Sequence, residues 1–145
     1  MDLELIFSLA GVLAMAGWAI LLVSPLIPVW SDRIAGLIIP ALLSVGYVVL
    51  AVFFPAQGDG GFNSLAEVSA LFSQPSALLA GWIHYLAFDL LIGAWICKTA
   101  RQENIRFWFV IPCLPLTFLF GPAGFLAFLL LRLIVRGKSR AAHPL

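Results

Sequence analysis

The sequence has little charge: 10% of its 145 residues are charged, and the formal net charge is +1. Such a chain has no electrostatic footprint for nucleic acid, so we expect no nucleic-acid partner. Its two cysteines, Cys97 and Cys113, lack the close spacing of a zinc site or of a thioredoxin-like redox pair. Without an evident internal repeat or low-complexity segment, residues 1–145 are predicted to form a single domain.

Apolar residues make up 63% of the chain and give it a mean hydropathy of +1.08. Soluble domains are about 45–50% apolar, and a chain of this length cannot bury such an excess in water. Four apolar runs reach or approach the roughly 20 residues with which a helix crosses a bilayer. They cover residues 3–23, 34–54, 76–97 and 107–135.

The predicted fold class is all-α: a polytopic membrane protein whose four transmembrane helices form an antiparallel bundle. Lipid offers the backbone no hydrogen-bond partners, and short connections make sequence neighbours antiparallel. The fourth run contains Pro112, Pro115 and Gly121-Pro122, so we expect a kinked helix that either packs or opens a ligand cavity. Four spans put both termini on one side. The Lys and Arg residues then divide four against four, which leaves the orientation open.

A short additional helix is expected in the second loop, at residues 65–73. Ser64 and Glu67 match a capping box, in which each side chain bonds a free N–H group at the helix start. Apolar residues then repeat on one face, as in a helix that lies at the membrane interface. Glu67 is therefore either a cap or a site residue.

Two ionisable residues, His84 and Asp89, lie in the middle of the third run. A charged side chain there costs about 2.5–3.5 kcal/mol on insertion scales, so such residues are rare without a role. They are about 140° apart around a helix axis, too far for a direct hydrogen bond, and we expect them to flank a cavity with Tyr85 between them. In the alternative structural interpretation, Asp89 pairs with a basic residue or bonds backbone groups freed by the prolines, and His84 links helices.

We expect neither a metal nor a cofactor. A metal site at His84 would need two or three carboxylates, and Asp89, Glu67 and Glu4 lie at different depths. Polar residues in the spans are also too few to line a channel.

The segment Gly81-Trp82-Ile83-His84-Tyr85-Leu86-Ala87-Phe88-Asp89-Leu90 resembles the signature of the abscisic-acid-deficient-four-like family of small four-helix membrane proteins. Further parts of the chain resemble this family as well: residues 72–75, 112–114 and 120–124, Thr117 and Arg132. Plant members of the family are associated with the conversion of violaxanthin to neoxanthin, an isomerisation that opens a 5,6-epoxide. Such a reaction needs an acid at the epoxide oxygen and a base for a nearby C–H proton.

The resemblance implies a membrane-embedded isomerase of a carotenoid or related isoprenoid. Its catalytic candidates are Asp89 as the acid, His84 as the base and Tyr85 as an alternative donor. The candidate substrate-binding residues are Trp82, Phe88, Thr117, Arg132 and Glu67. The alternatives are a non-catalytic carotenoid, retinoid or lipid-binding protein, and a structural membrane protein without a ligand.

The expected partners are membrane lipid and an apolar isoprenoid ligand. The glycines of the third run could pair helices within one chain or between two, so a homo-oligomer stays open. The acidic N-terminus is unlike a signal peptide, and we expect an integral protein of a bacterial inner membrane.

Overall fold

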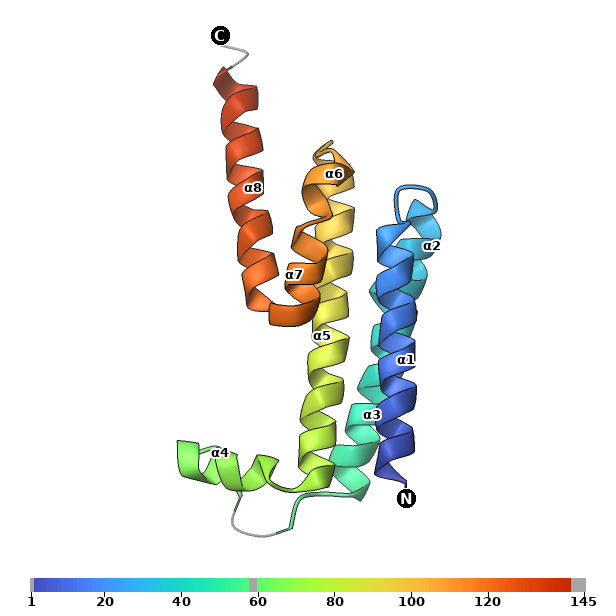
Figure 1. Ribbon diagram of the computed structural model, residues 1–145, viewed down its shortest axis with the longest axis vertical. Coiled ribbons are helices and arrows are strands. Elements are labelled where there is room, and N and C mark those ends of the chain that lie inside the picture. The colour runs from blue at the N-terminus through green and yellow to red at the C-terminus, as the bar shows by residue number, and fades with distance from the viewer. Residues whose placement is uncertain (1, 58–59, 142–145) are drawn as a thin grey trace.

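The computed structural model describes residues 2–57 and 60–141, and the regular elements in that part of the chain are all helical. Three helical segments are long and apolar enough to cross a membrane. They are α1 (Leu3–Leu22), the continuous segment Pro28–Phe53, and α5 (Pro75–Gln102), and they run side by side in alternating directions (Figure 1). The predicted all-α class, with helices apolar enough to span a membrane, is confirmed.

The second span begins earlier than the predicted residue 34. It consists of α2 (Pro28–Arg33), a π-helical turn (η1, Ile34–Ile38) and α3 (Ile39–Phe53). Proline suits the first position of α2, because the N–H group that it lacks has no helical partner there. Pro40 is the second residue of α3 and cannot donate to a preceding carbonyl, which accounts for the wider turn just before it.

The expected fourth span, residues 107–135, is not one kinked helix. It is divided into α6 (Phe107–Val110), α7 (Cys113–Phe120) and α8 (Pro122–Ala141). α7 runs along α5 only to about the middle of that helix, and α8 turns back toward the end from which the chain came (Figure 1). The predicted four-helix bundle is therefore not confirmed: beside three helical segments long enough to span a membrane, α7 and α8 form a helical hairpin.

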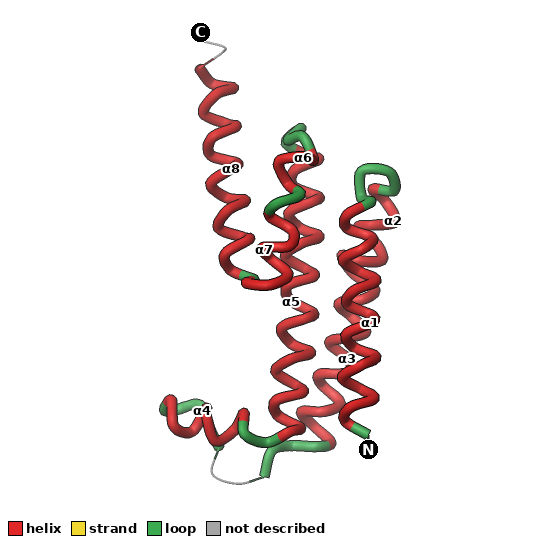
Figure 2. The backbone as a smooth tube through the Cα atoms, viewed as in Figure 1, coloured by secondary structure: helices red, strands yellow, loops and turns green. Residues whose placement is uncertain are grey.

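The reversal takes place at Gly121, with almost no loop between α7 and α8 (Figure 2). Gly121 has a φ of 35°, in the left-handed region that favours glycine. Pro122 then begins α8 at the first helical position, where proline is well accommodated.

Contacts along α8 show that it runs parallel to α5. Its start lies beside Asp89, and Phe128 contacts Trp95 with ring centroids 5.6 Å apart. Arg132 binds Glu103, the residue directly after α5. The last part of α8 therefore extends beyond the end of α5.

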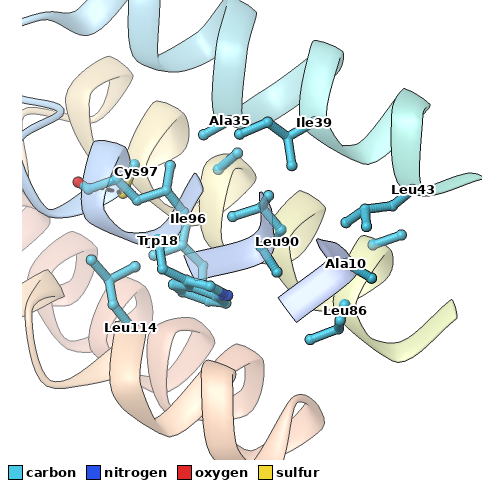
Figure 3. Packing of buried hydrophobic residues seen from close by; sticks show 14 of the residues in the cluster. Ala10, Trp18, Ala35, Ile39, Leu43, Leu86, Leu90, Ile96, Cys97 and Leu114 are labelled. Carbon is cyan, nitrogen blue, oxygen red and sulfur yellow. Dashed lines mark hydrogen bonds between the residues drawn. The ribbon is translucent and has the colours of Figure 1, made fainter. Parts of the chain in front are cut away.

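α5 is the central helix of the structure, because it packs against both other spans and against the hairpin (Figure 3). Leu90 and Ile96 in α5 are fully buried, as is Ala35 in η1. Small residues allow this close packing: a Cβ atom on Gly17 of α1 would lie 2.5 Å from a methyl carbon of Leu90.

Ion pairs join the elements at the C-terminal end of α5. Asp32 of α2 pairs with Arg101 of α5. Glu103 accepts hydrogen bonds from Nε of Arg132 (3.0 Å) and from Nη2 of Arg136 (2.6 Å). Hydrogen bonding to Arg132 is the main reason that the pKa of Glu103 lies below its ordinary value.

A short helix, α4 (Leu65–Phe72), lies across the other end of the spans, where the sequence predicts one (Figure 1). The Oγ of Ser64 accepts from the N–H of Glu67 (3.2 Å), and Oε2 of Glu67 accepts from the N–H of Asn63 (3.1 Å). The capping interpretation of Glu67 is thus the one that the contacts support. The N–H group that Glu67 binds belongs to Asn63, whereas a capping box would use the N–H group of Ser64.

The hairpin places the C-terminal end of α8 opposite the N-terminus (Figure 1). All Lys and Arg residues of the chain consequently belong to one end, which we call the basic end: Arg33, Lys98, Arg101, Arg106, Arg132, Arg136, Lys138 and Arg140. The opposite end, which we call the acidic end, holds the start of α1 with Asp2 and Glu4, and α4 with Glu67. The expected four-against-four division is therefore replaced by a strong asymmetry.

By the positive-inside rule, the basic end faces the side of the membrane on which the chain is synthesised. In a bacterial host, a green fluorescent protein fused to the C-terminus should therefore fluoresce in the cytoplasm. An alkaline phosphatase fused to the N-terminus behind an export signal should be active outside it. Two fusions that report the same side would contradict the hairpin and restore a fourth span.

A second expectation concerns the pH dependence of the hairpin. Because the folded protein lowers the pKa of Glu103, the stabilisation is present above the ordinary glutamate pKa, about 4.3, and is lost as the pH falls through the lowered value. Glu103→Gln should therefore lower the thermal midpoint in detergent at pH 7 and lower it much less at pH 3. If Glu103→Gln lowers the thermal midpoint equally at both pH values, the charge of Glu103 does not stabilise the hairpin.

Candidate functional site

The middle of α5 presents a carboxyl group to the reversal of the hairpin. Asp89 is 6% exposed, and a Cβ atom on Gly121 would lie 2.7 Å from its Oδ1. Its Oδ2 is buried and has no hydrogen-bond partner in the part of the chain that the structure describes. An unpaired buried polar atom costs about 1–3 kcal/mol, so Asp89 is a candidate for the acid as well as for a contact that supports the hairpin.

Tyr85 lies one turn before Asp89 and contacts the same hairpin. Its hydroxyl group donates a hydrogen bond of 2.6 Å to the carbonyl oxygen of Phe118, in the last turn of α7. Carbonyl groups at the end of a helix have no partner within the helix, and lipid cannot supply one. Tyr85 therefore bonds the carbonyl oxygen that the chain reversal leaves without a helical partner. In the structural interpretation of the sequence, Asp89 is the residue expected to bond such a backbone group.

His84 faces a different neighbour. Its ring lies edge-on to that of Tyr47 in α3, with centroids 5.6 Å apart, and stacks on that of Phe88 at 4.6 Å. His84 and Tyr47 line a cavity of about 500 Å³ between α3, α4, α5 and the second loop, which we call the α3–α5 cavity. Its other lining residues are Leu50, Ala51, Phe54, Pro55, Ala56, Phe62, Leu71, Phe72, Ser76, Ala77, Ala80 and Gly81.

The structure thus brings Asp89 and Tyr85 together at the hairpin, but it does not bring His84 to them. The sequence leads us to expect one cavity flanked by both ionisable residues. The five-residue spacing instead turns them toward different neighbours, because the hairpin occupies one face of α5 and α3 occupies another. His84 contacts Tyr47 of α3 instead, and it therefore belongs to a separate candidate site.

The five candidate substrate-binding residues lie in varied surroundings. Trp82 stacks on Tyr85 (5.4 Å), and Phe88 stacks on His84. Thr117 is fully buried and donates to the carbonyl oxygen of Cys113 (2.7 Å). Glu67 caps α4, and Arg132 pairs with Glu103 and lies over Trp95. Among these residues, Phe88 contacts His84, which lines the α3–α5 cavity.

Tyr47 is a further candidate functional residue, and local sequence patterns do not indicate it. In the sequence it is a single tyrosine in a long apolar run. The available signal is its hydroxyl group at membrane depth, where a polar group needs a partner or a purpose. That it faces His84 depends on the packing of α3 against α5, which the local sequence does not contain.

A second cavity, of about 280 Å³, lies between α1 and the α6–α7 segment. Trp18 and Leu114, both seen in Figure 3, are among its lining residues. Its accessible lining is apolar. This cavity therefore has room for a hydrocarbon chain but offers no group for acid–base chemistry.

The fold and the two sites define a polytopic helical membrane protein with a helical hairpin and an aromatic cavity between α3, α5 and α4. The family model described as ABA DEFICIENT 4-like matches residues 5–128, and the chain belongs to this family. The match includes the first two spans, where the resemblance in sequence is loose, and it ends before Arg132. No curated protein and no solved structure matches the chain.

The hairpin reversal gives a direct test of the contact with Asp89. Gly121→Ala combines an unfavourable positive φ with a methyl group against a carboxylate oxygen, so it should destabilise the protein by about 1–3 kcal/mol. Gly137→Ala is the matched control in α8, because a Cβ atom there meets nothing within 4 Å. Unfolding in detergent measures both variants. Equal stability of the two would argue against a tight reversal at Gly121.

Proposed function

We propose that this protein binds a carotenoid or a related isoprenoid in the α3–α5 cavity and isomerises one end of it by proton transfer. The observation that supports this most directly is the pairing of His84 with Tyr47 in a largely apolar cavity between α3, α5 and α4. Ligand sites typically combine apolar walls with a few polar groups that fix orientation. Membership of the ABA DEFICIENT 4-like family, whose plant members are associated with neoxanthin synthesis, favours an isoprenoid as the ligand.

Isomerisation by proton transfer requires one group that gives a proton and one that takes it. A tyrosine hydroxyl is a donor, and a neutral imidazole is an acceptor. Tyr47 donates a proton to the epoxide oxygen as its C–O bond breaks, and His84 takes a carbon-bound proton as the new C=C bond forms. The proton then returns from His84 to Tyr47, so that no net proton is consumed and no electron is exchanged with the protein. Positioned groups of this kind contribute about 10²–10⁴-fold each to a rate.

In this proposal Asp89 and Tyr85 have a supporting role, whereas the sequence resemblance gives both as catalytic candidates. Both contact the hairpin, and neither lines the α3–α5 cavity. We therefore assign them to holding α7 and α8 against α5. Asp89 stays the competing candidate for the acid, because its Oδ2 has no described partner, and the experiment below separates the two assignments.

The test is the carotenoid content of the protein purified from a carotenoid-producing host, analysed by mass spectrometry. His84→Gln and Tyr47→Phe should each lower product formation by about 100-fold or more while the protein still binds pigment. Gly46→Ala, next to Tyr47 and with open space at its Cβ position, should keep wild-type turnover.

Two other results would change the proposal. If Asp89→Asn abolishes turnover while Tyr47→Phe leaves it intact, the acid is Asp89. If the wild type binds pigment but returns it unchanged from every host, the protein is a non-catalytic isoprenoid-binding protein, the alternative that the sequence leaves open.

A further inference from the structure

The α3–α5 cavity is closed on one side by α4, a helix that contributes no buried residue to the core. Leu71 and Phe72, at the end of α4, are part of its wall. Phe72 meets α5 at Gly81: a Cβ atom on Gly81 would lie 2.5 Å from Cε1 of the Phe72 ring. The ring therefore occupies the space that any larger residue at position 81 would take.

The position of α4 itself is fixed by contacts on both sides. The N–H of Gln57, after α3, donates to Oε1 of Gln74 (2.6 Å), and Nε2 of Gln74 donates back to the carbonyl oxygen of Gln57. On the other side, a Cβ atom on Gly60 would lie 2.7 Å from Cα of Leu71, so the loop packs directly on the α4 backbone. These contacts hold the backbone near Phe72 in place and leave its ring as the part that can move.

The remaining walls favour a flat, wide group over a thin chain. Aromatic side chains from α3, the second loop, α4 and α5 line the cavity, which is open on one side: those of Tyr47, Phe54, Phe62, Phe72 and His84. A single extended hydrocarbon chain in about 500 Å³ leaves much of this wall without contacts, and each gap forfeits dispersion energy. A ring fills the space, and the ring of Phe72, as part of the wall, limits how large the ligand ring can be.

We infer that Phe72, seated on Gly81, is a specificity-determining residue of the α3–α5 cavity and sets the size of the isoprenoid end group that the cavity accepts. This inference rests on the proposed function, because it takes the ligand of the cavity to be an isoprenoid. Gly81 acts through Phe72: a methyl group at position 81 takes space from the cavity and displaces the ring.

Two C20 alcohols serve as probes: retinol, which has one six-membered end ring, and geranylgeraniol, which is acyclic. Binding to the purified protein in detergent is measured for each. The wild type should prefer retinol. Gly81→Ala should weaken retinol binding by about 10-fold or more, as one excess methyl group does in an apolar pocket, and should leave geranylgeraniol within about twofold, since a flexible chain can avoid a methyl group.

The double variant Gly81→Ala with Phe72→Ala should recover retinol binding relative to Gly81→Ala alone, because the displaced ring is gone. Phe72→Leu and Phe72→Ala leave Gly81 unchanged and remove the aromatic ring from the cavity wall. Each should therefore reduce the preference for retinol over geranylgeraniol. Gly46→Ala is the matched control, since its Cβ position meets nothing within 4 Å.

Two outcomes would overturn the inference, and they are distinct. If the wild type prefers retinol and all variants at positions 72 and 81 keep that preference, Phe72 does not set specificity and the proposed function is untouched. If the wild type binds neither probe, the cavity is not an isoprenoid site, and the proposed function fails together with the inference.

Discussion

The structure depends on how α5 accommodates a chain reversal in the middle of the membrane. Backbone groups at that depth must find partners within the protein. The Tyr85 hydroxyl group bonds the carbonyl oxygen of Phe118, and Gly121 lies against the carboxyl group of Asp89. The reversal in turn decides at which end α8 finishes, and thereby gathers Arg132, Arg136 and the basic residues that follow at the same end as Arg101.

α5 performs two tasks on two of its faces. Tyr85 and Asp89 face the hairpin, whereas His84 faces Tyr47 in α3. A spacing of one residue between His84 and Tyr85 is enough for this division, because each residue turns a helix by about 100°. Polar residues that are adjacent in sequence can therefore contact separate elements, and the proposed function gives them separate roles.

Local sequence patterns predict those helices that are determined by their own residues. The apolar runs of α1 and α5 require spanning helices, and Ser64 with Glu67 indicates the start of α4. The division at Gly121-Pro122 could not be predicted as a reversal, because the same residues suit a kink. The contact with Asp89, from another helix, decides between them. The pairing of His84 with Tyr47 likewise depends on tertiary packing, and so do the positions of the Lys and Arg residues.

The hairpin also gives the protein an uneven profile across the bilayer. α7 and α8 begin and end on the basic side of their contact with Asp89, so they add helical cross-section to that half of the membrane alone. The acidic half contains the three spans, with α4 lying across their ends. A body that is wider in one leaflet displaces more lipid there and bends the surrounding bilayer. The protein is thus wedge-shaped, and it should concentrate where the membrane is curved to match.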